Sequence, residues 1–210
     1  MLYKYVIFDV DGTLLDTKSL YVESLRKALK SYSGGDFAEE VLGASYGKPG
    51  LFTLKSLGVA EGDLAGAHKS MLSNYEAAWD TVKIFQGIAE LLDMLKSSGH
   101  VLAVATSRCD FEMDADRAFK PIMGFFDAIA CSEKDMPPKP CPDVLEKAAK
   151  LLGIAPGQAV YVGDTDYDRI AAEAAGMGFL GAGWGFEEEE LAGKAWEIIC
   201  RKPSEVLAAV

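Results

Sequence analysis

The feature that most constrains this chain is a short apolar run, residues 6–8, that ends in two aspartates. The run reads Val-Ile-Phe, with no polar residue in it, which is typical of a strand covered on both faces in a parallel sheet. Asp9 and Asp11 follow directly, two positions apart, so both carboxylates can converge on one point just beyond the strand. The sequence therefore predicts a buried strand that carries a charged site at its end.

Two carboxylates at one point repel each other unless a cation lies between them or one of them holds a proton. A hard divalent cation is the simplest partner, and oxygen ligands of this kind suit Mg²⁺. Gly12 comes next; glycine lets the backbone approach a ligand closely, and its N–H group could bind the oxygens of an anion. An Asp-Gly turn without a function is also common after a strand. The choice between a cation and anion site and an ordinary turn therefore depends on the rest of the sequence.

The charge of the chain limits its partners. The 210 residues include 21 basic and 32 acidic side chains, a net charge of −11, which argues against nucleic acid or an anionic membrane as the main partner. An anionic substrate must therefore be attracted locally, by a metal ion and a few lysines. We find no apolar stretch of the roughly 18 residues that a membrane span needs, no signal peptide and no Cys-x-x-Cys pair, and we expect a cytoplasmic protein with reduced thiols.

The pattern changes from strand to helix after residue 16. Amphipathic helices are predicted at residues 20–29, 37–42, 51–57 and 64–80. No strand signal appears between Leu14 and Val82. We therefore assign residues 16–82 to an inserted helical cap domain, and residues 1–15 and 83–210 to an α/β catalytic core.

Strands alternate with helices in the remainder of the chain. Strands are predicted at residues 101–105, 128–130, 159–162, 178–180 and 197–199, and helices at residues 88–97, 113–119, 142–152, 168–175, 187–192 and 203–209. Alternation of this kind indicates βαβ units, so the predicted fold class is α/β, a Rossmann-like three-layer core with a mainly parallel sheet. Ligands of such sheets bind beyond the carboxyl ends of the strands, where residues from separate strands should meet.

Polar residues follow the predicted strands at the positions where they could meet. Thr106 and Ser107 follow the strand at 101–105, and Asp164 and Asp168 follow the one at 159–162. Lys139 lies among prolines just before a predicted helix. Together with the aspartates after the first strand, four distant segments bring carboxylates, a hydroxyl group and an ammonium group to one edge of the sheet.

This set of motifs resembles the haloacid dehalogenase-like hydrolase superfamily, in the subfamily with a helical cap inserted after the first motif. In this chain the four family motifs look like Asp9-Val10-Asp11-Gly12-Thr13, Thr106-Ser107, Lys139-Pro140-Cys141-Pro142 and Gly163-Asp164 with Asp168. They occur in the family's order, and the resemblance covers nearly the whole chain. Within the family the chain is most similar to the phosphoglycolate phosphatase-like branch, whose relatives include pyrophosphatases and β-phosphoglucomutases.

The resemblance implies a Mg²⁺-dependent phosphatase acting on a small phosphate ester. Asp9, which at an ordinary pKa near ~3.9 is ionised at neutral pH, would attack phosphorus and form an aspartyl-phosphate. Asp11 would protonate the leaving oxygen and then activate the hydrolytic water. Thr106, the Ser107 backbone and Lys139 would hold the transferring phosphoryl group.

The same resemblance implies a metal site. Asp164 looks like the direct Mg²⁺ ligand of the family, joined by the Asp9 carboxylate and the main-chain carbonyl of Asp11. Asp168 is similar to the second acidic position of that motif, which either ligates the ion or orients it through water and Lys139. Magnesium is the only cofactor that we expect.

In capped relatives the cap meets the part of the substrate beyond the phosphate group. By that resemblance we expect Tyr46 and Lys48, in a glycine-containing loop of the insert, to face the leaving group; an ordinary solvent-exposed loop lysine is the competing interpretation. A β-phosphoglucomutase-like phosphotransferase and a pyrophosphatase remain alternatives. Asp11 disfavours a dehalogenase, because displacing a halide requires no acid. The sequence does not identify the substrate. It also leaves open whether the protein is a monomer or a homodimer.

Overall fold

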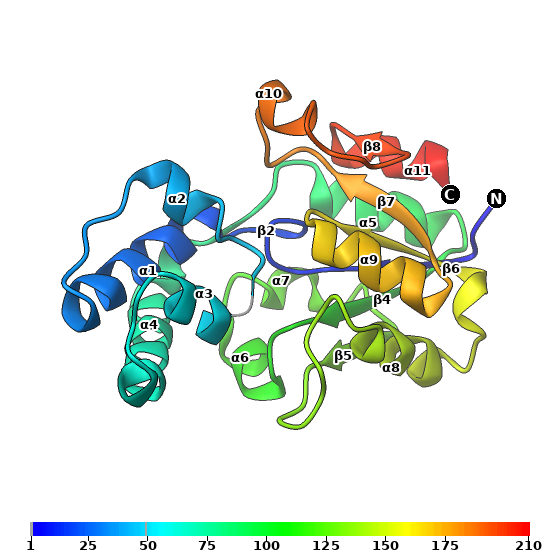
Figure 1. Cartoon of the computed structure of the whole chain (residues 1–210). Helices are drawn as coiled ribbons and strands as arrows, with labels where there is room; N and C mark the ends of the chain where they lie inside the picture. Colours follow the sequence, from blue (N-terminus) through cyan, green and yellow to red (C-terminus); the bar gives the residue numbers. More distant parts are fainter. Residues whose placement is uncertain (1, 49) are drawn as a thin grey trace. The chain divides into compact units, whose positions relative to one another are not determined.

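The computed structural model describes residues 2–48 and 50–210 of the chain. The chain divides into two compact units, of which the larger comprises Met1–Asp16 and Ile84–Val210 and the smaller Thr17–Lys83. Figure 1 shows the helices and strands of both units, coloured along the chain and most of them labelled. Within the described ranges, no helix is both long enough and apolar enough to cross a membrane.

A six-stranded sheet forms the centre of the larger unit, with the strand order β5-β4-β1-β6-β7-β8 and parallel pairing between all neighbours. The strands are β1 (Tyr5–Phe8), β4 (Val101–Thr106), β5 (Ala128–Cys131), β6 (Ala159–Gly163), β7 (Gly178–Ala182) and β8 (Ile199–Cys200). The order places the first strand of the chain in the middle of the sheet. This arrangement confirms the predicted α/β fold class with a mainly parallel sheet.

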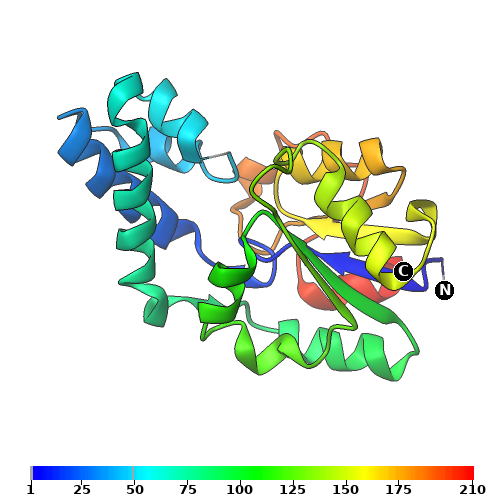
Figure 2. The same ribbon diagram turned by 90° about the horizontal axis from the view of Figure 1, so that it is seen from below.

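Helices cover both faces of this sheet. Helices α8 (Asp143–Leu152) and α9 (Asp166–Ala175) lie on one face, and α5 (Ile88–Ser97) and α11 (Val206–Ala209) on the other, as Figure 2 shows with α8 and α9 in yellow and α11 in red. Alternate residues of the central strands, among them Ile7, pack under α8 and α9. The larger unit also contains α6 (Asp110–Ala115), α7 (Lys120–Met123), α10 (Glu188–Leu191) and 3-10 turns at residues 156–158 and 203–205.

The register of β1 decides which residues meet at the edge of the sheet. Phe8 pairs with Val104 of β4 on one side and with Val162 of β6 on the other. The N–H group of Asp9 still donates to the carbonyl of Val162, at 2.9 Å. The segments that follow β1, β4 and β6 therefore begin side by side, as expected for parallel strands that carry a site at their carboxyl ends.

The smaller unit is helical and has a core of its own. Its helices are α1 (Lys18–Tyr32), α2 (Glu39–Gly43), α3 (Gly50–Ser56) and α4 (Leu64–Glu76), with 3-10 turns at residues 61–63 and 79–81. Its buried apolar residues are Val22, Leu25, Ala28, Leu29, Leu42, Leu54, Val59, Ala67 and Met71. These residues recur at helical spacing, which explains why the sequence predicts helices here.

A short sheet and a broken helix differ from the prediction. The chain forms a two-stranded sheet of β2 (Leu15–Asp16) and β3 (Lys83–Ile84), and strands of two residues leave no pattern in the sequence. The predicted helix at residues 113–119 is wrong, because α6 ends at residue 115 and α7 begins only at Lys120. The carboxylate of Asp116 accepts hydrogen bonds from the N–H groups of Ala118 and Phe119, at 2.7 and 3.1 Å. These side-chain bonds replace the helical ones and break the segment.

Candidate active site

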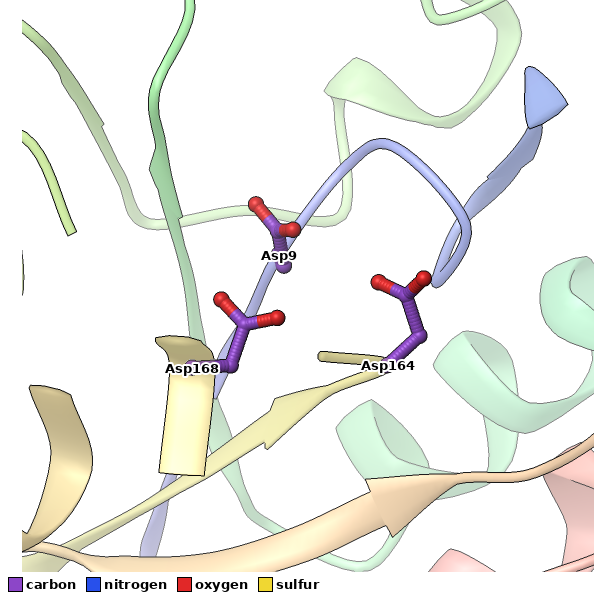
Figure 3. A group of neighbouring side chains, drawn as sticks. All are labelled: Asp9, Asp164 and Asp168. Carbon is purple, nitrogen blue, oxygen red and sulfur yellow. The ribbon is translucent and has the colours of Figure 1, made fainter. Parts of the chain in front are cut away.

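Three aspartates meet at the carboxyl end of the central strands. Asp9 follows β1, Asp164 follows β6 and Asp168 lies in the first turn of α9, and one carboxylate oxygen of each lies within 4.8 Å of the others (Figure 3). All three side chains are buried. Buried carboxylates at this separation repel each other, so the cluster requires positive charge nearby.

Lys139 supplies part of that positive charge. Its Nζ atom lies 2.9 Å from Asp9 Oδ1 and 2.7 Å from Asp168 Oδ1, and it donates to the Tyr161 hydroxyl at 2.8 Å. Burial lowers the pKa of Lys139, but the attraction of Asp168 and Asp9 outweighs it and raises that pKa well above its ordinary value. An ammonium group has three N–H donors, and these three contacts account for all of them. In this structure Lys139 is therefore directed at carboxylates and at Tyr161.

The protonation of Asp9 differs from the expectation. Burial raises the pKa of Asp9 to about 7, and the attraction of Lys139 compensates only in part, since Asp168 and Asp11 oppose it. An exposed aspartate would keep its ordinary pKa, and the depth of burial of Asp9 is not visible in the sequence. Asp9 therefore binds a proton more readily than an ordinary aspartate, and a metal ion bound beside it would favour its carboxylate form.

Asp164 has the features of a metal ligand. Its Oδ1 atom accepts a hydrogen bond from Thr13 Oγ1 at 3.2 Å, whereas Oδ2 is buried and has no hydrogen-bond partner among the described residues. Burial raises the pKa of Asp164 well above its ordinary value. Gly12 has φ +77°, and a Cβ atom there would lie 2.1 Å from Asp164 Oδ2, so glycine is needed for this close approach. An unpartnered carboxylate oxygen beside two further aspartates fits a hard cation such as Mg²⁺.

Asp168 is engaged through both of its oxygens. Oδ1 contacts Lys139 Nζ, and Oδ2 accepts from the N–H group of Thr165 at 3.0 Å and from its hydroxyl at 2.6 Å. The Thr165 hydroxyl in turn accepts from the N–H group of Asp168 at 3.1 Å, which forms a capping box. Helix α9 therefore begins at Asp166, two residues earlier than predicted. These contacts favour the orienting role of Asp168, through Lys139, over direct ligation.

The second motif and Asp11 lie close together in the larger unit. Thr106 is buried at the end of β4, and its Oγ1 accepts from the N–H group of Arg108 at 3.2 Å, while Ser107 is exposed. The carboxylate of Asp11 lies outside the cluster of three aspartates and pairs with Arg108. Nε of Arg108 donates to Asp11 Oδ2 at 2.8 Å and Nη2 donates to Oδ1 at 2.6 Å.

The two expected substrate contacts of the insert lie in the smaller unit. The Tyr46 hydroxyl is 2.7 Å from Thr17 Oγ1, and its ring packs edge-on against Tyr21 with the ring centroids 5.3 Å apart. Lys48 is half-buried. Tyr46 thus contributes to packing within its own unit, and a contact of either residue with a substrate stays a prediction.

Two residues that belong to none of the four sequence motifs support the site. The Tyr161 hydroxyl accepts from Lys139 and donates to the carbonyl of Ala105 at 2.8 Å, in the middle of the sheet. The indole N–H group of Trp184 donates to the carbonyl of Thr13 at 2.9 Å and holds the turn of the first motif. A tyrosine within an otherwise apolar strand is a signal that could have been used, because its hydroxyl needs a buried partner.

A parallel sheet with an aspartate cluster at its carboxyl end and a helical unit inserted after the first strand is typical of one class of hydrolases. Comparison with known proteins points to the same class. Residues 6–182 match the family model described as haloacid dehalogenase-like hydrolase, and the chain belongs to this family. Among its relatives is the pyrophosphatase PpaX of Bacillus velezensis, which is 29% identical over 180 residues, or 85% of this chain and 82% of the relative. The family expected from the sequence is confirmed.

Solved structures show the same fold. A candidate phosphoglycolate phosphatase from Lactobacillus plantarum superimposes with a TM-score of 0.89 over 100% of both chains at 24% identity, which is a likeness of fold alone. CbbY from Rhodobacter sphaeroides, solved in complex with phosphate, has a TM-score of 0.75 and 26% identity over 97% of this chain and 96% of its own.

Proposed function

We propose that this protein is a Mg²⁺-dependent phosphatase that hydrolyses a small phosphorylated metabolite through an aspartyl-phosphate intermediate on Asp9. The observation that carries the proposal is the buried cluster of Asp9, Asp164 and Asp168 around Lys139 at the end of the central strands. The family membership and the similarity to CbbY, whose structure holds phosphate, support a phosphoryl group as the reacting part of the substrate.

Each residue of the cluster has a role in this chemistry. Asp9, fixed by its backbone bond to β6 and by Lys139, is the nucleophile that attacks phosphorus. A bound Mg²⁺ would be held by Asp164, Asp9 and the carbonyl of Asp11, and would neutralise charge on the phosphoryl group. Thr106 and the backbone N–H group of Ser107 bind the phosphoryl oxygens.

Asp11 handles the protons of both half-reactions. When the phosphoryl group moves to Asp9, Asp11 gives a proton to the leaving oxygen, and it then takes a proton from the water that hydrolyses the aspartyl-phosphate. Its side chain is 31% exposed, so solvent can restore its protonation state between turnovers. Gly12, next in the chain, places its backbone against Asp164 and leaves room for the phosphate oxygens.

Phosphate release from a panel of small phosphate esters, with and without Mg²⁺, tests the proposal. We expect Mg²⁺-dependent turnover, and a loss of about 1,000-fold or more in Asp9→Asn, because the amide is not a nucleophile. Asp166→Asn is the matched control, since Asp166 lies outside the cluster and accepts from Trp196. Turnover retained by Asp9→Asn, or no release from any ester, would contradict the proposal.

The relatives suggest which further substrates belong in the same panel. The similarity to PpaX supports including inorganic pyrophosphate. A β-phosphoglucomutase-like activity would show as isomerisation of a sugar phosphate that depends on added bisphosphate, with little free phosphate. Hydrolysis of monoesters in preference to both would favour the phosphatase over these alternatives.

We further propose that Lys48 and Tyr46 contact the leaving group. Lys48→Ala is then expected to raise KM for the preferred natural ester about tenfold, because a charge-assisted hydrogen bond is lost, and to change KM for p-nitrophenyl phosphate much less. Lys55→Ala is the control, since Lys55 pairs with Glu61 on the surface of the same unit. Equal effects of Lys48→Ala on both esters would show that the lysine is an ordinary surface residue.

A further inference from the structure

Arg108 fixes the proposed acid of the reaction in one orientation. Its guanidinium donates from Nε and Nη2 to the two oxygens of Asp11, at 2.8 and 2.6 Å. A two-point contact of this kind defines both the position and the plane of a carboxylate, which a single hydrogen bond or a lysine does not. Asp11 is 31% exposed, and the two-point contact restricts the rotamers of its side chain.

Arg108 is itself held from two sides. Nη1 forms an ion pair with Asp116, which is fully buried and whose other oxygen accepts from the N–H groups of Ala118 and Phe119. The main chain of Arg108 donates to Thr106 Oγ1 and accepts from the N–H group of Ser132 at 2.9 Å. The orientation of the Asp11 carboxylate is therefore set by a rigid network that extends from the end of β4.

A contribution to the stability of the fold does not by itself explain the ion-pair network of Arg108. Arg108 is 7% exposed, so its charge is largely removed from water, and buried ion pairs often contribute little net stability after that cost. The network does connect Asp11 with Thr106, two residues before Arg108, in one unit. It thus links Asp11, the proposed proton donor to the leaving oxygen, to Thr106, which is proposed to bind the phosphoryl group.

We infer that Arg108 is a positioning residue that orients Asp11 toward the leaving oxygen, and that Asp116 holds Arg108 in place for this purpose. The inference rests on the proposed phosphatase function. In the step concerned, the bond between an Asp9 oxygen and phosphorus forms, the bond between phosphorus and the leaving oxygen breaks, and the leaving oxygen takes the proton of Asp11. Both oxygens of Asp11 keep their contacts with the guanidinium in this step, because a carboxyl group has about four lone-pair positions and the two contacts with Arg108 occupy only part of them.

The test compares two esters that differ in their need for an acid. An alkoxide leaves only with a proton, whereas p-nitrophenolate leaves without one. For Arg108→Ala we expect the ratio of kcat/KM for the best alkyl phosphate to kcat/KM for p-nitrophenyl phosphate to fall about tenfold or more, since a positioned acid contributes 100-fold or more to such a step. In an Asp11→Asn background, Arg108→Ala should not change this ratio further.

Two more variants control for folding and charge. Arg108→Lys keeps a cation beside Asp116 but loses the two-point contact with Asp11. The ratio of the two specificity constants should also fall in this variant, by a smaller factor than in Arg108→Ala. Arg108→Ala removes the partner of buried Asp116, and thermal unfolding followed by circular dichroism will show whether this variant folds. If it does not fold, Arg108→Lys provides the test. Arg201→Ala removes a similar two-donor contact, to exposed Glu188, and should leave the ratio as in the wild type.

The outcomes separate this inference from the proposed function. If Arg108→Ala lowers both specificity constants by the same factor, or if the ratio still changes in the Asp11→Asn background, Arg108 does not act through Asp11 and the inference is wrong. If the wild type hydrolyses neither ester, both the inference and the proposed function are wrong. Hydrolysis of both esters with an unchanged ratio in Arg108→Ala and Arg108→Lys overturns the inference alone.

Discussion

Lys139→Met is expected to destabilise the protein by about 3 kcal/mol at neutral pH and to lower phosphate release at least about 100-fold. Removing one partner of a buried ion pair leaves the other charge without compensation. Here two carboxylates, of Asp9 and Asp168, and the Tyr161 hydroxyl would lose the same donor. Urea unfolding gives the change in the free energy of unfolding, and phosphate release gives the activity.

The loss should depend on pH. Without Lys139 the pKa of Asp9, already about 7 in the wild type, can only rise, whereas in the unfolded chain it is near ~3.9. Between pH 7.5 and 5.5 the folded variant then binds more protons than the folded wild type, whereas the two unfolded chains bind equally many at this position. The stability of the variant relative to the wild type therefore recovers as the pH falls through this range. Lys147→Met is the control, because the half-exposed pair of Lys147 with Glu133 should contribute less than about 1 kcal/mol. An equal loss at both pH values would argue against buried charge as the cause.

Addition of Mg²⁺ is expected to stabilise the wild type, by about 2.7 kcal/mol when its concentration is 100 times its dissociation constant. Asp164→Asn should abolish this stabilisation. In the absence of Mg²⁺, however, the variant should be at least as stable as the wild type at pH 8, because burial disfavours the ionised form of Asp164. Thermal unfolding of both proteins, with EDTA or with Mg²⁺, measures the two effects.

The pH dependence of the Mg²⁺ effect follows from Asp9. A cation competes with the proton that Asp9, with a pKa of about 7, still binds at pH 6 but has mostly lost at pH 8. The stabilisation by Mg²⁺ should therefore be larger at pH 8 than at pH 6. Asp166→Asn should keep the full effect. A shift in melting temperature that is equal in Asp164→Asn and in the wild type would place the bound ion elsewhere.

The parts of the fold that could be predicted are those that depend on local pattern. The first strand was visible because three apolar residues stand before Asp9, and α5 has the predicted bounds Ile88–Ser97 because its apolar residues recur at helical spacing. The sites at the ends of β1, β4 and β6 followed from the rule that parallel strands present their carboxyl ends at one edge. Pattern and topology together therefore suffice to bring the candidate site residues of the larger unit together.

What could not be predicted depends on contacts between distant residues. Nothing near Arg108 in the sequence indicates that it pairs with Asp11, 97 positions away. The pKa of Asp9 depends on its burial and on Lys139, which the chain brings into place only through the sheet. The break between α6 and α7 came from the Asp116 side chain, which competes with the helical backbone in a way that periodicity does not reveal.

The strand order also determines when the site can form as the chain is synthesised. Strand β1 is made first and lies between β4 and β6, which begin at residues 101 and 159. One edge of β1 therefore has no partner strand until about half of the chain is made, and the other edge has none until β6 follows. Unpaired strand edges promote aggregation. The core of the smaller unit is complete much earlier, by Met71. A chain that ends before Asp164 thus contains the helical core but only Asp9 of the aspartate cluster, so the cluster assembles late in synthesis.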